Sequence, residues 1–165
     1  MSNLQVRLVN LSPLRVASLS GFGPNPEDLA FQKLDAWAGP RGLLADPEKH
    51  PVFGFNNPDP VAGNPDYGYE LWIVVGPEFE LAEGDAVRLH NFPGGRYAVT
   101  RCEVPEGDAP GLEVIGQTWQ KLVAWRDENG YQRGHQQWLE KMVPAELPGI
   151  RFVLDLYLPI AERLV

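Results

Sequence analysis

The sequence has little cysteine, no long hydrophobic run and no basic leader. Its single cysteine, Cys102, cannot form an internal disulfide, which excludes a disulfide-stabilised scaffold. The longest apolar run, residues 71–75, is far shorter than the roughly 20 residues of a membrane-spanning helix. The N-terminal residues lack the basic and apolar regions of a signal peptide. We therefore expect a cytoplasmic protein that does not bind membranes.

Basic clusters and metal-binding motifs are also missing. The net charge is −8, and residues 1–85 carry 12 acidic side chains against 5 basic ones. Binding to nucleic acid requires clustered lysine and arginine, so no direct nucleic-acid binding is expected. The three histidines, His50, His90 and His135, are scattered without metal-ligand spacing, and no glycine-rich phosphate loop or Gly-x-Ser-x-Gly motif is present. We expect no metal and no cofactor.

Glycine and proline, by contrast, are abundant. The 165 residues include 17 Gly and 16 Pro, one residue in five, and 44% are hydrophobic. This length and composition predict a single globular domain over residues 1–165, with many turns and loops. Residues 38–68 alone contain 6 Pro and 5 Gly. This segment is interpreted either as a lid over a ligand or as a loop that covers a sheet edge.

Three pairs of segments recur in the same order along the chain. The offsets are 81, 88 and 85 residues, and the pairs are VRLVNLSPLRVA (6–17) with VRLHNFPGGRYA (87–98), FQKLDAW (31–37) with WQKLVAW (119–125), and YELWI (69–73) with LDLYL (154–158). Such collinear similarity indicates an internal duplication. We expect two half-repeats, at about 4–80 and 85–160.

Local patterns predict an α/β (α+β) fold built from a duplicated strand-helix-strand unit. Helices are expected from Asn25-Pro26 to Gly39-Pro40 and from Asp108 to Asn129-Gly130, because caps and terminators flank helical apolar spacing. A further short helix is predicted at 136–142. Strands are expected at 6–10, 15–20, 52–55, 70–75, 87–91, 96–103 and 151–158. Two pseudo-symmetric halves, an antiparallel sheet and a central ligand groove follow from the duplication.

Two acidic residues occupy equivalent positions in equivalent apolar strands. Because side chains alternate along a strand, Glu70 shares a face with Trp72, and Asp155 shares a face with Tyr157. The opposite faces are apolar and are expected to pack under the helices. Carboxylates beside aromatic rings form a site for cations. The alternative is that both acids are simply solvated on an outer sheet face.

Other aromatic residues are weaker candidates. Trp37, Trp119 and Trp125 fit a core role better than a site, but Trp119 is the one expected to line the groove in part. Phe55 is a further candidate for contact with an apolar ligand. Cys102 is expected to pack quietly, since only Arg101 beside it would favour the thiolate. The predicted ligand-binding set is therefore Glu70, Trp72, Asp155, Tyr157, Phe55 and Trp119.

The ordered segments together resemble the GyrI-like small-molecule-binding domain, which also serves as the effector-binding domain of AraC-type and MerR-type multidrug regulators. The segments are VRL (6–8), FQKL (31–34), VFGF (52–55), YELWI (69–73), PGGRYAV (93–99), WQKL (119–122) and LDLYLP (154–159). The resemblance implies two pseudo-symmetric halves with a cleft that binds hydrophobic, often cationic compounds through a glutamate ringed by aromatics. The family usually shows Glu-x-Tyr in the last strand, whereas this chain has Asp155-Leu-Tyr157, which shifts weight toward Glu70.

Three hypotheses for function follow. The leading one is a stand-alone small-molecule-binding protein, since the domain begins by Val6 and leaves no room for an N-terminal helix-turn-helix. The second is hydrolysis of strained electrophilic toxins with Glu70 or Asp155 as the catalytic carboxylate. The third, also implied by the resemblance, is a protein-interaction role with gyrase or a DNA-binding regulator as partner, in which the acidic first half docks on a basic surface.

Overall fold

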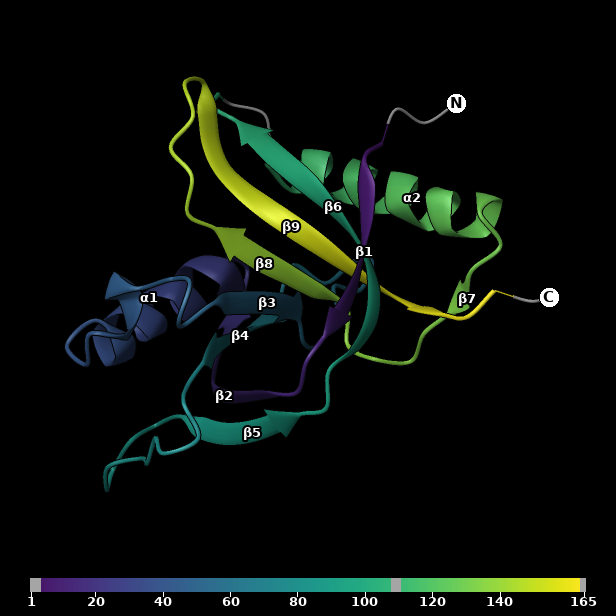
Figure 1. Cartoon of the computed structure of the whole chain (residues 1–165). Helices are drawn as coiled ribbons and strands as arrows, with labels where there is room; N and C mark the ends of the chain where they lie inside the picture. The colour runs from purple at the N-terminus through teal and green to yellow at the C-terminus, as the bar shows by residue number, and fades with distance from the viewer. Residues whose placement is uncertain (1–3, 108–110, 164–165) are drawn as a thin grey trace. The chain divides into compact units, whose positions relative to one another are not determined.

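The computed structural model describes residues 4–107 and 111–163, which form two compact units (Figure 1). Residues 13–93 make up one unit, here called the middle unit. Residues 1–12 and 94–165 make up the other, called the terminal unit because both chain ends belong to it. Each unit combines an antiparallel sheet with one α-helix, so the predicted α+β class is confirmed. Among the described residues, no helix is both long and apolar enough to cross a membrane.

The middle unit is a four-stranded sheet covered on one face by a helix. Its strands are β2 (Leu14–Gly23), β3 (Val52–Asn56), β4 (Tyr67–Val74) and β5 (Arg88–Phe92), in the order β5-β2-β4-β3. Helix α1 (Pro26–Ala38) follows β2, and a 3-10 turn, η1 (Leu43–Ala45), comes before β3. A Cβ on Gly21 would lie 2.9 Å from the backbone nitrogen of Ala30, so glycine allows α1 to approach β2 closely.

The terminal unit repeats this arrangement with longer strands. Its main sheet has the order β1-β6-β9-β8, made of β1 (Val6–Leu11), β6 (Gly95–Pro105), β8 (Leu139–Val143) and β9 (Ile150–Ala161). The short strand β7 (Gln132–Arg133) also pairs with β9. Helix α2 (Gly111–Glu128) lies behind β6 and β1 in Figure 1. It packs on the apolar face of β9, where Leu154, Leu156 and Leu158 surround Leu122.

The two units share one strand order, but they do not coincide with the sequence halves. The first strand of each half pairs within the other half: β1 with β6, and β5 with β2. The half-repeats predicted at about 4–80 and 85–160 are thus linked by an exchange of their first strands. An origin by duplication stays a prediction.

Most element predictions from the sequence are confirmed, and one is wrong. Helix α1 ends at Ala38 and α2 at Glu128, directly before the predicted Gly39-Pro40 and Asn129-Gly130 terminators. The Asn25 side chain makes no capping hydrogen bond, although Pro26 begins the helix as expected; Asp108 lies outside the described residues. The helix predicted at 136–142 is instead occupied in part by β8, because pairing with β9 overrides the local preference of Glu140 and Lys141.

Candidate functional site

Glu70 lies on the face of the middle sheet that α1 does not cover. Its cross-strand partners are Phe55 on β3 and Ser20 on β2. Directly opposed residues share a face, so Glu70, Trp72, Phe55 and Ser20 all project to the same side. The predicted grouping of Glu70 with Trp72 is therefore confirmed, and Phe55 joins them.

In the part of the chain that the structure describes, the groups that hydrogen-bond to the Glu70 carboxylate are neutral. The Trp72 indole donates from Nε1 to Oε2 at 2.6 Å, and the Asn57 amide donates from Nδ2 to Oε1 at 3.2 Å. Among the described residues, no lysine, arginine or histidine forms an ion pair with it. The side chain is partly exposed. Glu70 thus presents a negative charge that is held in place but not neutralised by a cation.

Aromatic rings surround the Trp72 indole beside this carboxylate. Phe55 meets Trp72 edge-on at 4.9 Å between ring centroids, and Phe92 and His90 lie at 5.2 and 5.3 Å. Trp72 is 5% and Phe55 7% exposed, so both rings are packed in fixed positions. Edge-to-face pairs of this kind stabilise by about 0.5–1.5 kcal/mol beyond burial. The carboxylate therefore adjoins a rigid apolar cluster.

A cleft of about 630 Å³ opens beside Glu70 within the middle unit. It is lined by Ser18, Leu19, Ser20, Lys33, Ala36, Trp37, Arg41, Glu70, Ala86, Val87 and Arg88. Its volume falls within the 300–1,000 Å³ of typical small-molecule sites. Two of its basic side chains are engaged elsewhere: Lys33 donates to the Ser20 carbonyl at 2.8 Å and Arg41 to Asp85 at 2.6 Å. Arg88 has no partner among the described residues.

Trp37 is a cleft residue that the sequence did not identify. It packs in the core as predicted, yet it also lines the cleft, and its buried Nε1 has no acceptor within the described part of the chain. A buried donor without a partner is costly, so this indole nitrogen lowers the stability of the unit. Its helical spacing with Leu34 and Ala30 on α1 is typical of a core residue. The sequence gives no sign that Trp37 also lines a cleft.

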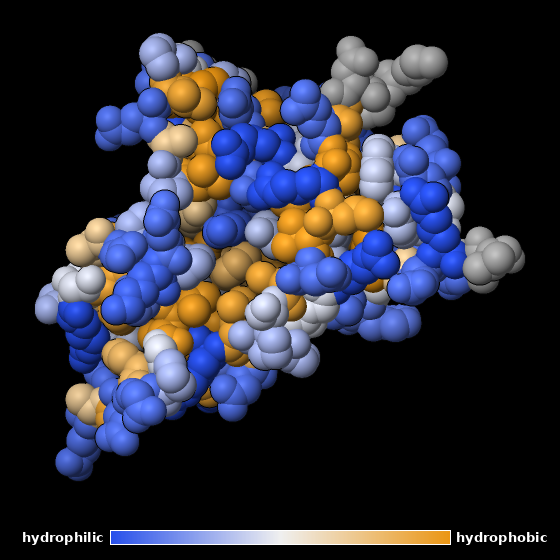
Figure 2. All heavy atoms as spheres, viewed as in Figure 1, coloured by the Kyte–Doolittle hydropathy of each residue, from blue (hydrophilic) through white to orange (hydrophobic). Residues whose placement is uncertain are grey.

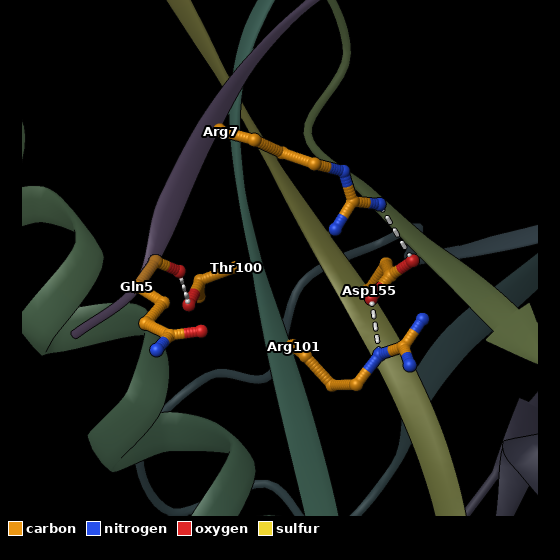
Figure 3. A network of polar contacts seen from close by, with 5 residues as sticks. All are labelled: Gln5, Arg7, Thr100, Arg101 and Asp155. Atoms are coloured by element: carbon orange, nitrogen blue, oxygen red, sulfur yellow. Dashed lines mark hydrogen bonds and ion pairs between the residues drawn. The ribbon is translucent and has the colours of Figure 1, made fainter.

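Asp155 has quite different surroundings in the terminal unit (Figure 3). It is 3% exposed, and its Oδ2 and Oδ1 accept hydrogen bonds from Arg7 Nη2 at 2.9 Å and from Arg101 Nε at 3.1 Å. Partial burial acts to lower the pKa of Arg7, but the hydrogen bond and charge of Asp155 outweigh it, and the pKa is raised. A cationic ligand would have to compete with two guanidinium groups for this carboxylate.

Two tyrosines lie on the same face as Asp155. Tyr157 meets Tyr97 edge-on at 5.5 Å, and Tyr97 donates from its hydroxyl to the Gln137 carbonyl at 2.7 Å. Burial raises the pKa of Tyr97 well above its ordinary value, and burial also raises that of Tyr157, although the nearby Arg7 opposes the shift. The predicted grouping of Asp155 with Tyr157, opposite Leu154, Leu156 and Leu158, is confirmed.

Trp119 lies on the opposite face of the terminal sheet from Asp155 and Tyr157. It packs against the apolar cluster under α2, donates from Nε1 to Glu140 at 3.2 Å and stacks at a tilt on Trp138. The structure therefore does not bring Trp119 together with those two residues. Glu70 and Asp155 belong to different units, and a groove shared by them stays a prediction.

The described residues contain one buried thiol and no cluster of metal-ligating side chains. No group of three or more His, Cys, Asp or Glu side chains there is arranged to hold a metal ion. Cys102 is buried in the core under α2, and burial raises the pKa of its thiol. The functional groups around Glu70 and Asp155 are carboxylates held in place by hydrogen bonds, aromatic rings and arginines.

Comparison with solved structures shows where this fold occurs. The C-terminal domain of EcmrR aligns over 99% of this chain and 100% of its own length, with 15% identity and a TM-score of 0.67. In the EcmrR–DNA complex, this chain spans 58% of the EcmrR chain, with a TM-score of 0.66. A hydrolase from Listeria innocua has 14% identity over 96% of this chain and 92% of its own, with a TM-score of 0.60. SAV2435 bound to tetraphenylphosphonium has 12% identity over 96% and 94%, with a TM-score of 0.54.

At such low identity these likenesses show the fold alone. No match was found among curated proteins. The model of the GyrI-like small molecule binding domain, however, matches residues 4–161, nearly the whole sequence. The chain belongs to the GyrI-like small-molecule-binding domain family.

Proposed function

We propose that this protein binds a hydrophobic small molecule with a cationic group, and that Glu70 supplies the counter-charge. The observation that carries the proposal is the Glu70 carboxylate, which is partly exposed, lines the cleft and, among the described residues, accepts side-chain hydrogen bonds only from Trp72 and Asn57. A partly exposed carboxylate that forms no ion pair within the described part of the chain attracts an organic cation through its charge. SAV2435, which shares this fold, is bound to such a compound, tetraphenylphosphonium.

The rest of the site divides the work of binding. Leu19, Ala36 and Val87 in the cleft wall offer apolar contact, which contributes about 25 cal/mol per Å² of buried area. Trp72 and Phe55 hold the Glu70 carboxylate in position and do not neutralise its charge. Asp155 was predicted as a second counter-charge, but its two arginines make Glu70 the stronger candidate.

Calorimetric titration with tetraphenylphosphonium tests the proposal. Glu70→Gln keeps the shape and one of the two acceptor oxygens but removes the charge, and it should weaken binding by at least about tenfold, since charge-assisted contacts contribute roughly 1.5–3 kcal/mol. Glu48→Gln is the matched control: it removes the same charge from an exposed residue of the same unit, outside the cleft. Equal weakening in both variants, or none in Glu70→Gln, would contradict a role for Glu70.

Hydrolysis is the second candidate, because the same carboxylate lines an open cleft and a hydrolase from Listeria innocua shares the fold. Glu70 would take a proton from a water molecule that attacks a strained electrophilic ring, and the ring-opened product would carry the added water. Mass spectrometry of such a compound after incubation with the protein decides the point. Product that forms with the wild type but not with Glu70→Gln supports an enzyme, and an unchanged compound supports binding alone.

A further inference from the structure

A group of arginines in the terminal unit surrounds a buried acid. Asp155 is almost fully buried, whereas the side chains of Arg7 and Arg101 are each 51% exposed. The two guanidinium groups come from neighbouring strands, β1 and β6, and converge on the one carboxylate of β9 (Figure 3). Each guanidinium therefore has one end fixed in the protein and the other in contact with solvent.

Most of the hydrogen-bond donors of this pair remain unused. A guanidinium carries five N–H donors, and Arg101 donates only from Nε to Asp155. Arg7 uses Nη2 on Asp155 and also lies near the Tyr157 hydroxyl. The terminal nitrogens of Arg101 find no acceptor within the described part of the chain. They form the fork that binds oxyanions with two parallel hydrogen bonds.

The charge of the surrounding face is positive, although the chain as a whole carries −8. Lys141 on β8 lies directly across from Asp155, on the same side of the sheet. By strand alternation the charged residues of this face are Arg7, Arg101, Lys141 and Arg151 against Asp155 and Glu103, an excess of two positive charges. In Figure 2, strongly hydrophilic residues cover β6 on this face.

From these observations we infer that Arg7 and Arg101 form a binding site for an oxyanion, a carboxylate or phosphate group, and that Asp155 positions them. Because Asp155 already fixes both guanidinium groups, little side-chain entropy is lost when an anion binds. This pre-organisation increases the affinity of the pair for an anion. Both oxygens of the buried carboxylate already accept a hydrogen bond from an arginine, so a cation would have to compete with two guanidinium groups. This inference does not rest on the proposed function of Glu70, which concerns the other unit.

Arginine-detected NMR of the full chain tests the inference. Inorganic phosphate and sodium acetate are titrated separately, at constant ionic strength set with chloride, and the Nε–Hε resonances are followed. We expect saturable shifts at Arg101 and Arg7. Stronger binding of phosphate would identify a phosphate group as the ligand, and stronger binding of acetate a carboxylate.

Variants separate a defined site from general surface charge. Arg101→Gln and Arg7→Gln should each weaken the binding of the anion that the wild type binds more tightly, phosphate or acetate, by about tenfold. Arg133→Gln is the matched control, because Arg133 is exposed on β7 and its cross-strand partner Ile160 packs on the α2 side of the sheet; it should leave binding unchanged. Arg101→Lys keeps the charge but loses the fork, and it should also weaken binding.

Two outcomes would overturn the inference. One is a wild-type titration in which Arg101 shifts linearly with anion, without saturation and no more than Arg133. The other is equal weakening by Arg133→Gln and Arg101→Gln. Because the wild-type resonances are read directly, the first outcome is decisive even if a variant proves too unstable to study.

Discussion

The strands β4 and β9 carry the same pattern, an acid followed two residues later by an aromatic, but their acids have opposite electrostatic surroundings. Glu70 on β4 is partly exposed and accepts hydrogen bonds only from neutral donors. Asp155 on β9 is buried and is bound by two arginines. The same motif thus yields an available negative charge in the middle unit and a neutralised one in the terminal unit.

The difference comes from the neighbouring strands rather than from the motif. Across from Glu70 lies Ser20 on β2, whereas across from Asp155 lies Arg101 on β6, and these two positions correspond at the 81-residue offset. The counterpart of Arg7 at the same offset is Arg88, which lines the cleft but is not paired with Glu70. A single serine in place of arginine therefore accounts for much of the contrast.

The largest expected effect tests the neutralised side of the comparison. Replacing both arginines in Arg7→Gln/Arg101→Gln leaves Asp155 buried without either of its ion-pair partners, which should lower the free energy of unfolding by about 3 kcal/mol. Urea denaturation measures the loss, and Arg133→Gln serves as the control with a change below about 0.5 kcal/mol. Glu70→Gln should behave like the control, because its partners are neutral. A double variant as stable as the wild type would show that the network does not stabilise the fold.

The second effect is a dependence of the free energy of unfolding on pH, which arises from two tyrosines on the same face as Asp155. Tyr97 and Tyr157 have raised pKa values in the folded state, chiefly because of burial, while unfolded tyrosine titrates near pH 10. Their contribution to stability is fully present below about pH 10 and is lost as the pH rises through the folded values, because the unfolded state then releases protons more readily. The slope should approach about 1.4 kcal/mol per pH unit for Tyr97, and Tyr157 should add to it in the same direction.

Urea unfolding at pH 9 to 11.5, with tyrosinate absorbance at 295 nm as the second probe, measures this loss. Phenylalanine at either position removes its share of the slope. If all tyrosines ionise near pH 10 in the folded protein, the assigned burial is wrong.

The helices and most strands could be predicted because the features that form them, such as helix terminators and side-chain alternation, lie within each segment. The alternation around Glu70 and Asp155 determines which side chains share a face, and the pairing of β4 and β9 with their neighbours preserves that alternation. The stop at Gly39-Pro40 is equally local, because proline has no backbone N–H with which to continue the helical hydrogen bonds. The grouping of Glu70 with Trp72 likewise follows from strand alternation, whereas Phe55 joins them only through the pairing of β3 with β4.

What the sequence could not provide is the register between distant strands. The arginines on Asp155 come from β1 and β6, and no local pattern indicates that Arg7 reaches a residue 148 positions away. The strand at β8 was mistaken for a helix for the same reason, since its pairing with β9 is a tertiary effect. Trp119 packs against the core under α2, as its helical spacing indicates, and the part of the groove expected beside it stays a prediction.

A third experiment converts one side of the comparison into the other. Ser20→Arg places a guanidinium across from Glu70, as Arg101 lies across from Asp155. If a missing arginine is what leaves Glu70 available, this variant should weaken tetraphenylphosphonium binding by about tenfold, roughly 1.4 kcal/mol. Ser20→Gln, which adds length without charge, is the control for steric blocking. Equal losses in the two variants would attribute the effect to size and not to charge.

The smallest effect concerns Arg88, the counterpart of Arg7. It lines the same cleft as Glu70 and has no acidic partner among the described residues, so its charge opposes the approach of a cation. Removing an exposed like charge changes such an interaction by a few tenths of a kcal/mol in water, because the solvent screens it. Arg88→Gln should therefore strengthen tetraphenylphosphonium binding about twofold, and the gain should shrink as salt is raised. Arg133→Gln, in the other unit, should change nothing. A loss of affinity in Arg88→Gln would mean that the guanidinium stacks on the phenyl rings of the ligand, and that this contact outweighs the repulsion between the two positive charges.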